Sequence, residues 1–417
     1  MSATPAPVGA LTHAVHRQGT SWVQARERAH TLGRSLPTPT VSIQLAEATG
    51  FVLRDPVRSR TSLPPHAASA MDGWVVAGDP PWLIGAPIDA GDTPDRTPLI
   101  AGTARPICTG APLPPGAVGV LRLENGDEHS AGASARSGRV VVRGERARPD
   151  EPRPGEHVRA AAEEAKEGEL LIASGSVLTP PRIALAAAGG YDVLRVAAAP
   201  GVDLLVLGDE LAASGVPRTG RIRDIVTPAF PALLATLGAR VSAVSRAADD
   251  RRATAAAMAA SEAAVLIATG GSSRGRTDHA RAAAESLGVR WEVDGVAMRP
   301  GHPVAFGCRP DGRIVLLLPG NPLAAVAGLL SFGTQLLGGM LGLPPSRLAQ
   351  VPLAETVSGH HGDTRLVAVA IQHDGAHALA MQGSGMLRGL AAADGLAVVH
   401  PGSGATGETV PMLPLPW

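Results

Sequence analysis

The chain is poor in three kinds of residue: cysteine, aromatic residues and lysine. Two of its 417 residues are cysteine, so it carries neither a disulfide framework nor a zinc site built from cysteines. Aromatic residues make up 2% of the chain, which leaves few side chains for stacking on nucleic-acid bases. Lys166 is the only lysine among 37 basic residues, so any cation that the function requires should be an arginine.

The chain also lacks a net charge of either sign. Its 37 basic residues balance 37 acidic ones, so no overall field attracts nucleic acid or an anionic membrane, and neither is expected as a partner. Residues 1–20 show no basic segment followed by an apolar run, so no secretory signal is predicted. We therefore expect a cytoplasmic protein.

One stretch without charged residues, 314–346, is long enough to cross a membrane. The tetrapeptide Pro319-Gly320-Asn321-Pro322 interrupts it, however, and polar residues and glycines follow. A buried strand, a turn and a helix explain this pattern better than a membrane span does.

The first part of the chain predicts a helix followed by a small β domain, within a length that suggests roughly three domains. Residues 21–33 form the helix, because Ser21 and Gln24 fit a capping box and Gly33 fits a stop signal. A second helix-like patch covers 45–52. In residues 58–146 short apolar runs alternate with Gly, Pro and Asp turns, which is typical of a small β domain.

The segment 146–155 is rich in proline and charged residues and is predicted to be a domain boundary. The prediction groups 147–195 with 21–57 as an N-terminal helix and linking domain. The last part of the chain, 346–417, again shows short strands between Gly and Pro turns and is predicted to be a second small β domain.

Residues 196–342 alternate between short apolar strands and helices. This alternation predicts an α/β domain with a parallel, doubly wound sheet. The expected strands are 202–207, 239–244, 264–268 and 314–318, and the expected helices are 227–237, 251–260, 278–287 and 323–337.

Unusual loops follow three of these strands. They are Gly208-Asp209-Glu210, the segment 269–278, and the tetrapeptide 319–322. Ligands of open α/β sheets bind beyond the carboxyl ends of the strands. These three loops are therefore the expected site.

The second loop has the composition of an oxyanion site. Its glycines let backbone N–H groups converge on an anion, its hydroxyls add donors, and a helix begins near Asp278. A phosphate is the expected ligand. The alternative is that the loop is a plain glycine-rich turn between strand and helix and binds no ligand. The predicted contributors from this loop are Gly270, Gly271, Ser272, Ser273 and Gly275.

Two further features suit a phosphate ligand. Asp209 and Glu210 follow a strand directly, and carboxylates beside a phosphate site favour a divalent cation such as Mg²⁺. In the segment 299–303, Arg299 and His302 lie in a turn rigidified by two prolines, where a cation would suit a phosphate. A turn carboxylate and a surface β-turn are the respective alternatives.

Taken together, these segments resemble the molybdopterin molybdenumtransferase family, which includes the C-terminal domain of gephyrin. One tetrapeptide is a weak signal, but six motifs in the same order over nearly the whole chain are a strong one. The matching segments are Ser69-Ala70-Met71-Asp72-Gly73, Thr109-Gly110-Ala111-Pro112, Gly208-Asp209-Glu210-Leu211, Gly270-Gly271 through Gly275 and Asp278, Arg299-Pro300-Gly301 with Pro303, and Pro319-Gly320-Asn321-Pro322.

The resemblance implies a fold and a reaction. The fold is α/β plus β: a doubly wound molybdopterin-binding domain, an inserted small β domain, an elongated linking domain and a C-terminal β-barrel-like domain. The reaction is insertion of molybdate into adenylated molybdopterin, with hydrolysis of the adenylate, release of AMP and assistance from Mg²⁺. The resemblance further implies a homodimer, and a molybdopterin adenylyltransferase is a possible partner.

Carried over by position, the resemblance assigns roles to single residues. Asp72, Thr109, Glu210 and Asp278 would be catalytic, Glu210 and Asp278 would hold the metal, and Asp72 and Thr109 would reach in from the partner subunit. The residues that would bind the substrate are Gly208, Asp209, Asp224, Gly270, Gly271, Ser272, Ser273, Gly275, Arg299, His302, Pro319, Gly320, Asn321 and Pro322.

The chain departs from the family pattern at several of these motifs. His302 stands where the family has a second lysine, and Ile225-Val226 replace a polar Ser-Asn pair after Asp224. These changes leave an alternative function open, in which the chain binds or carries molybdopterin or the molybdenum cofactor without catalysis.

Overall fold

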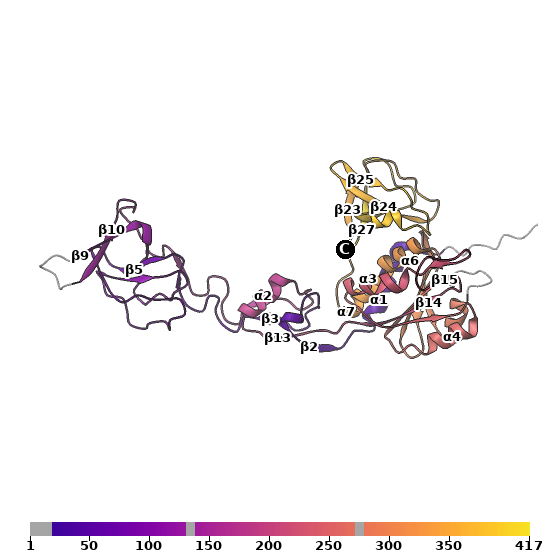
Figure 1. Ribbon diagram of the computed structural model, residues 1–417, viewed down its shortest axis with the longest axis horizontal. Coiled ribbons are helices and arrows are strands. Elements are labelled where there is room, and N and C mark those ends of the chain that lie inside the picture. The colour runs from indigo at the N-terminus through magenta and orange to yellow at the C-terminus, as the bar shows by residue number, and fades with distance from the viewer. Residues whose placement is uncertain (1–18, 131–137, 272–278) are drawn as a thin grey trace, which may run out of the picture. The chain divides into compact units, whose positions relative to one another are not determined.

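The computed structural model describes residues 19–130, 138–271 and 279–417 (Figure 1). The chain divides into two compact units: residues 1–41 with 197–417, here called the α/β unit, and residues 42–196, here called the β unit.

The α/β unit is built on a six-stranded sheet with the order β17-β14-β18-β22-β21-β19. Four strands are parallel, as predicted: β14 (Gly201–Leu207), β17 (Arg240–Ala247), β18 (Val265–Thr269) and β22 (Ile314–Leu318). The other two, β19 (Arg290–Asp294) and β21 (Ala305–Cys308), are antiparallel and were not predicted. Each is short, so its apolar pattern is too brief to stand out in the sequence.

Both faces of this sheet are covered by apolar side chains, which explains the unbroken hydrophobic runs of its strands. In β14, Leu204 and Val206 face one core cluster while Leu205 and Leu207 face another. The first cluster includes residues from α3 (Val226–Thr236), α6 (Pro322–Gly328) and α7 (Thr334–Leu341), and the second includes residues from α4 (Arg251–Ala259) and α5 (Ala280–Ser286). The doubly wound arrangement is thus confirmed.

The uncharged stretch after β22 forms a buried helical segment. α6 continues through a π-helical turn, Leu329–Gly333, into α7. In the described residues, 322–341 is the one helix long and apolar enough to cross a membrane, but 89% of its apolar window is buried inside the protein. It is therefore a core helix, in agreement with the sequence prediction.

The N-terminal helix α1 (Trp22–Arg34) packs against α7 within the α/β unit (Figure 1). The Ser21 hydroxyl accepts a hydrogen bond from the Gln24 N–H (3.3 Å), so the predicted N-cap is present. Gly33 lies inside the helix, which ends at Arg34. Glycine is required there because a Cβ would overlap the Leu336 backbone of α7. The predicted helix end at Gly33 is therefore corrected to Arg34.

The C-terminal residues form a second sheet that also belongs to the α/β unit. Its order is β1-β20-β24-β26-β27-β23, with β25 paired to β24. The strands from the tail are β23 (Ala349–Pro352), β24 (Thr364–Gln372), β25 (Gly375–Ala378), β26 (Gly395–Val399) and β27 (Thr409–Pro414), and α8 (Arg388–Ala391) lies between β25 and β26. Two strands from earlier in the chain, β1 (Thr20–Ser21) and β20 (Val296–Arg299), complete it.

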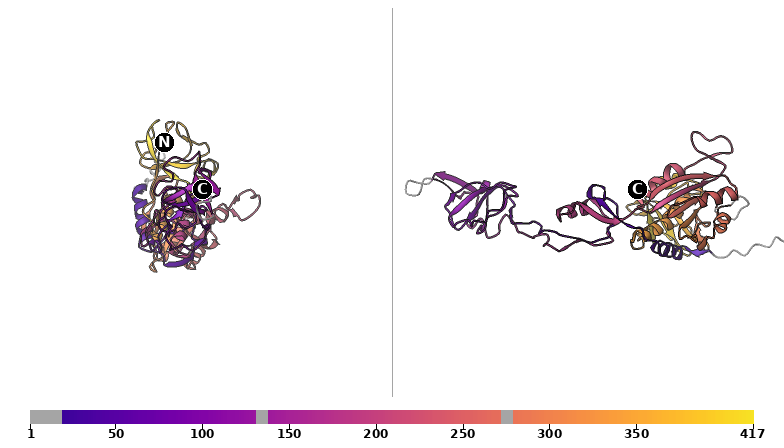
Figure 2. Two further views of the ribbon diagram at one scale, coloured as in Figure 1. Left: turned by 90° about the vertical axis from the view of Figure 1, so that its left-hand side faces the viewer. Right: turned by 90° about the horizontal axis from the view of Figure 1, so that it is seen from below.

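The β unit contains the predicted small β structure, a six-stranded sheet with the order β8-β5-β7-β6-β10-β9 (Figure 2, right). Trp74, Trp82, Leu121 and Val141 pack in its core. The strands are β5 (Gly73–Ala77), β6 (Trp82–Ile84), β7 (Thr103–Ile107), β8 (Gly119–Arg122), β9 (Gly126–Ser130) and β10 (Arg139–Arg143).

Short elements make up the rest of both units. The predicted helix-like patch at 45–52 is only a 3-10 turn, Leu45–Glu47, and a second 3-10 turn covers Leu123–Asn125. The other elements are β2 (Thr40–Gln44), β3 (Val57–Arg58), β4 (Ala68–Ser69), β11 (Val158–Arg159), β12 (Leu170–Ile172), α2 (Pro180–Ala188), β13 (Val193–Ala197), β15 (Leu211–Ala212) and β16 (Ile222–Arg223). The four predicted domain boundaries stay predictions.

Candidate functional site

The three loops predicted from the sequence meet at one edge of the α/β sheet, beyond the carboxyl ends of β14, β18 and β22. They line a cavity of about 750 Å³, here called the strand-end cavity. Its walls are Leu207, Gly208, Glu210, Ile222, Arg223, Ile225, Asp249, Gly270, Gly271, Gly320, Asn321, Pro322, Gly385 and Leu387. The predicted Ser272, Ser273, Gly275 and Asp278 lie outside the described residues.

Two glycines make the close approach of these loops possible. The Gly270 N–H donates to the Leu318 carbonyl (3.2 Å), which joins the ends of β18 and β22. Gly270 has φ +90°, and a Cβ there would lie 2.5 Å from the Leu207 carbonyl oxygen, so no larger residue fits. A Cβ on Gly320 would already touch the Gly270 Cα at 3.4 Å. The floor of the cavity is therefore bare backbone.

Two carboxylates line the strand-end cavity, Glu210 after β14 and Asp249 after β17. Asp249 is tied to Asp209 by a reciprocal pair of bonds: the Asp209 N–H donates to the Asp249 carboxylate (3.2 Å), and the Asp249 N–H donates to the Asp209 carboxylate (3.4 Å). Sequence reasoning missed Asp249 because it ended this strand at Val244, whereas β17 continues to Ala247. Ligands of open α/β sheets bind beyond the carboxyl ends of the strands, so the correct end of β17 would have pointed to Asp249.

The cavity suits a divalent cation only together with a phosphate ligand. Among the described residues there is no group of three or more His, Cys, Asp or Glu side chains placed to hold a metal ion. Mg²⁺ is commonly held by one or two carboxylates plus substrate phosphates, and Glu210 and Asp249 fit that requirement.

Asp224 does not line the cavity, although its neighbours Arg223 and Ile225 do. Its carboxylate is buried and accepts hydrogen bonds from the backbone of Val226 (2.8 Å) and Thr227 (3.1 Å) at the start of α3, and it pairs with Arg246. Burial would raise the pKa of Asp224, but the bonds from Thr227 and Val226 and the Arg246 charge outweigh it and lower that pKa. Asp224 therefore holds the start of α3 beside the cavity and does not line the cavity itself.

A second hollow of about 380 Å³, here called the arginine hollow, adjoins the strand-end cavity at Asn321, which lines both. Arg299, His302 and Pro319, all predicted, lie in its wall together with Arg365, which was not predicted. Arg299 and Arg365 are partners in the parallel pairing of β20 with β24. The hollow also includes Pro300, Gly301, Pro303, Ala324, Leu366, Gln382 and Ser384.

The cationic side chains of the arginine hollow are held by neighbours. The Arg299 guanidinium lies 3.0 Å from the Asp363 carboxylate, and Arg365 donates to the Ser358 carbonyl (2.6 Å). His302 Nδ1 lies 2.7 Å from the Val296 carbonyl oxygen. Since a carbonyl oxygen only accepts, Nδ1 carries the proton and the imidazole orientation is fixed. The hollow therefore presents two guanidinium groups and one imidazole, with the Arg299 charge partly balanced by Asp363, and this arrangement suits a small anion.

In the β unit the structure brings together Asp72 and Thr109, the two residues of this unit that the resemblance assigns to the site. The Asp72 Oδ1 accepts from the Thr109 N–H (2.6 Å) and from the Thr109 hydroxyl (2.9 Å). These two bonds, the backbone one first, lower the pKa of Asp72, so the exposed carboxylate stays ionised.

Fold and site thus define a class of protein: a multi-domain α/β protein with a glycine-lined cavity at the strand ends of its sheet. Three family models match successive parts of the chain. They are described as "MoeA N-terminal region (domain I and II)" for residues 20–190, "Probable molybdopterin binding domain" for 203–338 and "MoeA C-terminal region (domain IV)" for 350–415.

Individual relatives agree with these matches. Molybdopterin molybdenumtransferase 2 of Mycobacterium tuberculosis is 30% identical over 85% of this chain and 90% of its own length. The molybdopterin molybdenumtransferase of Synechococcus elongatus is 31% identical over 78% and 82%. A molybdopterin biosynthesis MoeA protein of Pyrococcus horikoshii has the same fold, with a TM-score of 0.75 at 19% identity over 94% and 99%. The chain belongs to the molybdopterin molybdenumtransferase family.

Proposed function

We propose that this enzyme of molybdenum cofactor biosynthesis inserts molybdate into adenylated molybdopterin, hydrolyses the adenylate and releases AMP. The observation that carries the proposal is the pair of adjoining hollows. One has bare backbone and two carboxylates, and the other has two arginines, and they meet at Asn321. A phosphate-bearing substrate and a small dianion can therefore bind side by side.

Each hollow contributes different chemistry. Backbone N–H groups beside Gly270 and Gly271 suit the phosphates, because no side chain obstructs their approach. Arg299 and Arg365 would attract molybdate and hold it next to the pterin substrate, with Asp363 balancing part of the Arg299 charge. Bringing two anions together is costly without such compensation, so positioning and charge balance are the main catalytic contributions of these residues.

Glu210 and Asp249, with the substrate phosphates, would hold Mg²⁺ in the strand-end cavity. When bound, the ion would stabilise negative charge on the phosphate oxygens and the departing AMP. Asp278 is a further proposed ligand and lies outside the described residues.

The proposal includes a homodimer in which Asp72 and Thr109 of one chain complete the site of the other. It rests on the family resemblance of the motifs that contain Asp72 and Thr109, which belong to the β unit, whereas Glu210 belongs to the α/β unit. We further propose a cytoplasmic reaction, supplied with substrate by a molybdopterin adenylyltransferase. Retention of the motif carboxylates Asp72, Glu210 and Asp278 favours an enzyme over a carrier, which has no need of them.

The test is a turnover assay with the purified full chain, adenylated molybdopterin, molybdate and Mg²⁺. The wild-type chain should release AMP and active cofactor, and Glu210→Ala should lower kcat by about a hundredfold or more through the loss of a metal ligand. Glu262→Ala, which removes an exposed acid outside the cavity, should not change it. Tight pterin binding without AMP release would refute the insertion reaction and leave the carrier function.

The same assay tests the shared site. Asp72→Asn and Glu210→Ala should each be nearly inactive, yet an exchanged mixture should recover about a quarter of wild-type activity, because half of the dimers then carry one intact site. A mixture no more active than its components would refute the arrangement across the dimer without affecting the insertion reaction.

A further inference from the structure

The Asp72 turn, residues 69–73, is held on both flanks by backbone hydrogen bonds. On one flank the Leu123 N–H donates to the Asp72 carbonyl (3.0 Å), and on the other the Ala70 N–H donates to the His157 carbonyl (2.8 Å). The position of the Asp72 carboxylate against Thr109 therefore depends on where Leu123 and His157 lie.

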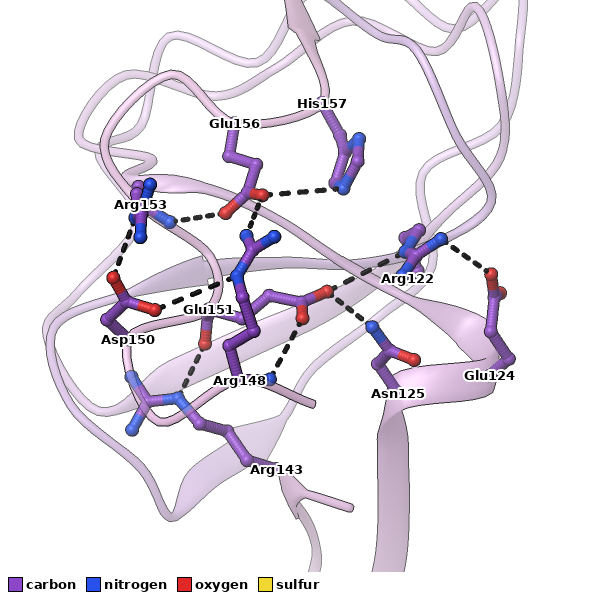
Figure 3. Close-up of polar contacts among 10 residues, drawn as sticks. All are labelled: Arg122, Glu124, Asn125, Arg143, Arg148, Asp150, Glu151, Arg153, Glu156 and His157. Atoms are coloured by element: carbon purple, nitrogen blue, oxygen red, sulfur yellow. Dashed lines mark hydrogen bonds and ion pairs between the residues drawn. The ribbon is translucent and has the colours of Figure 1, made fainter. Parts of the chain in front are cut away.

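Both flanking segments are tied into one network of charged and polar side chains, with the Glu151 carboxylate at its centre (Figure 3). Glu151 is 1% exposed, and it accepts hydrogen bonds from Asn125 Nδ2 (2.6 Å) and from the Arg148 N–H (3.2 Å). The Arg122 Nε lies 3.7 Å from the same carboxylate. Asn125 is itself 2% exposed and ends the 3-10 turn that begins with Leu123.

The other side of the network reaches His157 through Arg148. The Arg148 guanidinium pairs with Glu156, which directly precedes His157 in the chain (Figure 3). Glu156 is fixed further by the Arg153 N–H, which donates to its carboxylate (2.8 Å), and by the Val120 N–H, which donates to its carbonyl (3.0 Å). A continuous path of contacts thus joins Asn125 to His157 by way of Glu151.

A buried carboxylate at this place is not explained by stability alone. Removing a carboxylate from water is costly, and a well-packed apolar residue often stabilises a fold as well as a buried ion pair does. What the carboxylate adds is a fixed geometry, since it satisfies several donors from different segments at once.

We infer that Glu151 is a positioning residue for Asp72, fixing through Asn125 and Arg148 the two segments that carry the Asp72 turn. Its expected effect on turnover rests on the proposed function. Its effect on the Asp72 carboxylate does not, so the two can be tested separately.

Glu151→Gln is the direct test. The substitution keeps the size of the side chain. It replaces one carboxylate oxygen, which accepts a hydrogen bond from a neighbouring donor, with an amide NH₂ group that can only donate. The turn should then shift and loosen the bonds from Thr109, so the pKa of Asp72 should rise toward its usual value. Carbon-13 NMR of the full chain with labelled aspartate measures this pKa, and Asp72→Asn assigns the signal. In the turnover assay kcat should fall roughly tenfold with KM little changed.

Matched variants separate positioning from general damage. Glu128→Gln breaks the exposed pair of Glu128 with Arg139 (2.8 Å) in the same sheet, away from both flanks, and should change neither the pKa nor kcat. Adding Asn125→Asp to Glu151→Gln reverses the amide and carboxylate partners and should restore part of both. Arg148→Gln cuts the path while leaving the buried carboxylate in place, so it decides the matter if Glu151→Gln does not fold.

Two results are decisive. An unchanged Asp72 pKa in folded Glu151→Gln and Arg148→Gln would overturn the inference. A raised Asp72 pKa with unchanged turnover would support the positioning and would instead contradict the catalytic role proposed for Asp72.

Discussion

The strand-end cavity and the Asp72 turn are positioned by different means. In the cavity the parallel sheet positions the site residues: Glu210 and Asp249 follow parallel strands, and glycines allow the loops to approach each other closely. The Asp72 turn has no such frame and depends on particular side chains, with Glu151 at their centre. Site residues that topology positions should tolerate changes in nearby charge, whereas residues that a polar network positions should not.

The largest effect that sharpens this comparison is expected from Gly270→Ala. A Cβ at Gly270 would press on the Leu207 carbonyl oxygen, so the ends of β14 and β18 must separate. We expect pterin binding to weaken more than tenfold and the free energy of unfolding to fall by about 2 kcal/mol or more. Fluorescence titration of the pterin and urea unfolding measure the two quantities.

Gly220→Ala is the matched control for Gly270→Ala. Gly220 also has a positive φ, +82°, but a Cβ there would meet nothing within 4 Å. It should cost only the backbone strain, about 1 kcal/mol, and leave pterin binding intact. Equal losses in the two variants would show that strain, not the approach of the loops, is what matters.

A medium effect is expected from Asp224→Asn, which removes a buried charge next to the cavity without touching its wall. Because the folded-state pKa of Asp224 is lowered, its ionised form stabilises the fold above about pH 4 and this contribution is lost as the pH falls below that value. At pH 7 the variant should lose about 1–3 kcal/mol of unfolding free energy, and at pH 3 the difference should shrink.

Asp250→Asn provides the comparison for Asp224→Asn. Asp250 also caps a helix, accepting from the Ala253 N–H (2.8 Å), but it is exposed, and within the described residues no arginine pairs with it as Arg246 pairs with Asp224. Its loss should be smaller, below about 0.5 kcal/mol, because asparagine caps a helix about as well as aspartate does. A gap between wild type and Asp224→Asn that stays constant with pH would contradict the assigned charge.

The smallest effect is expected from His302→Gln in the arginine hollow. His302 lines this hollow beside Arg299, so its replacement should weaken molybdate binding about twofold to fivefold at a fixed pH. Isothermal titration measures the dissociation constants of the wild type and the variant. His373→Gln, in an exposed turn, should behave as wild type. Equal molybdate affinity in His302→Gln and wild type would remove His302 from anion binding.

Much of the α/β unit could be predicted because its signals are local. Unbroken apolar runs marked β14, β18 and β22, and glycine-rich loops marked their ends. Asp249 was missed only because the polar residues at the end of β17 interrupt its apolar pattern, so the strand was predicted to end too early. The antiparallel pair β19 and β21 was missed because β21 has only four residues and β19 is largely exposed, so neither shows a strong period.

The segment 146–155 shows a different limit of the sequence. Proline and charge there predict a domain boundary, which stays a prediction, but they give no sign that Glu151 in its middle is buried among Asn125, Arg122 and the Arg148 backbone. A charged residue in a sequence does not say whether a partner elsewhere in the chain will bury it.

The sequence by itself determined where β14, β18 and β22 end to within a residue, where glycine must stand and that Glu210 follows β14, since these depend on residues a few positions apart. Tertiary structure alone decided that Arg365 meets Arg299 across β20 and β24 and that Glu151 meets Asn125. The reason is physical: periodicity and turn chemistry act along the chain, whereas strand pairing and the burial of a charge join residues that only folding brings together.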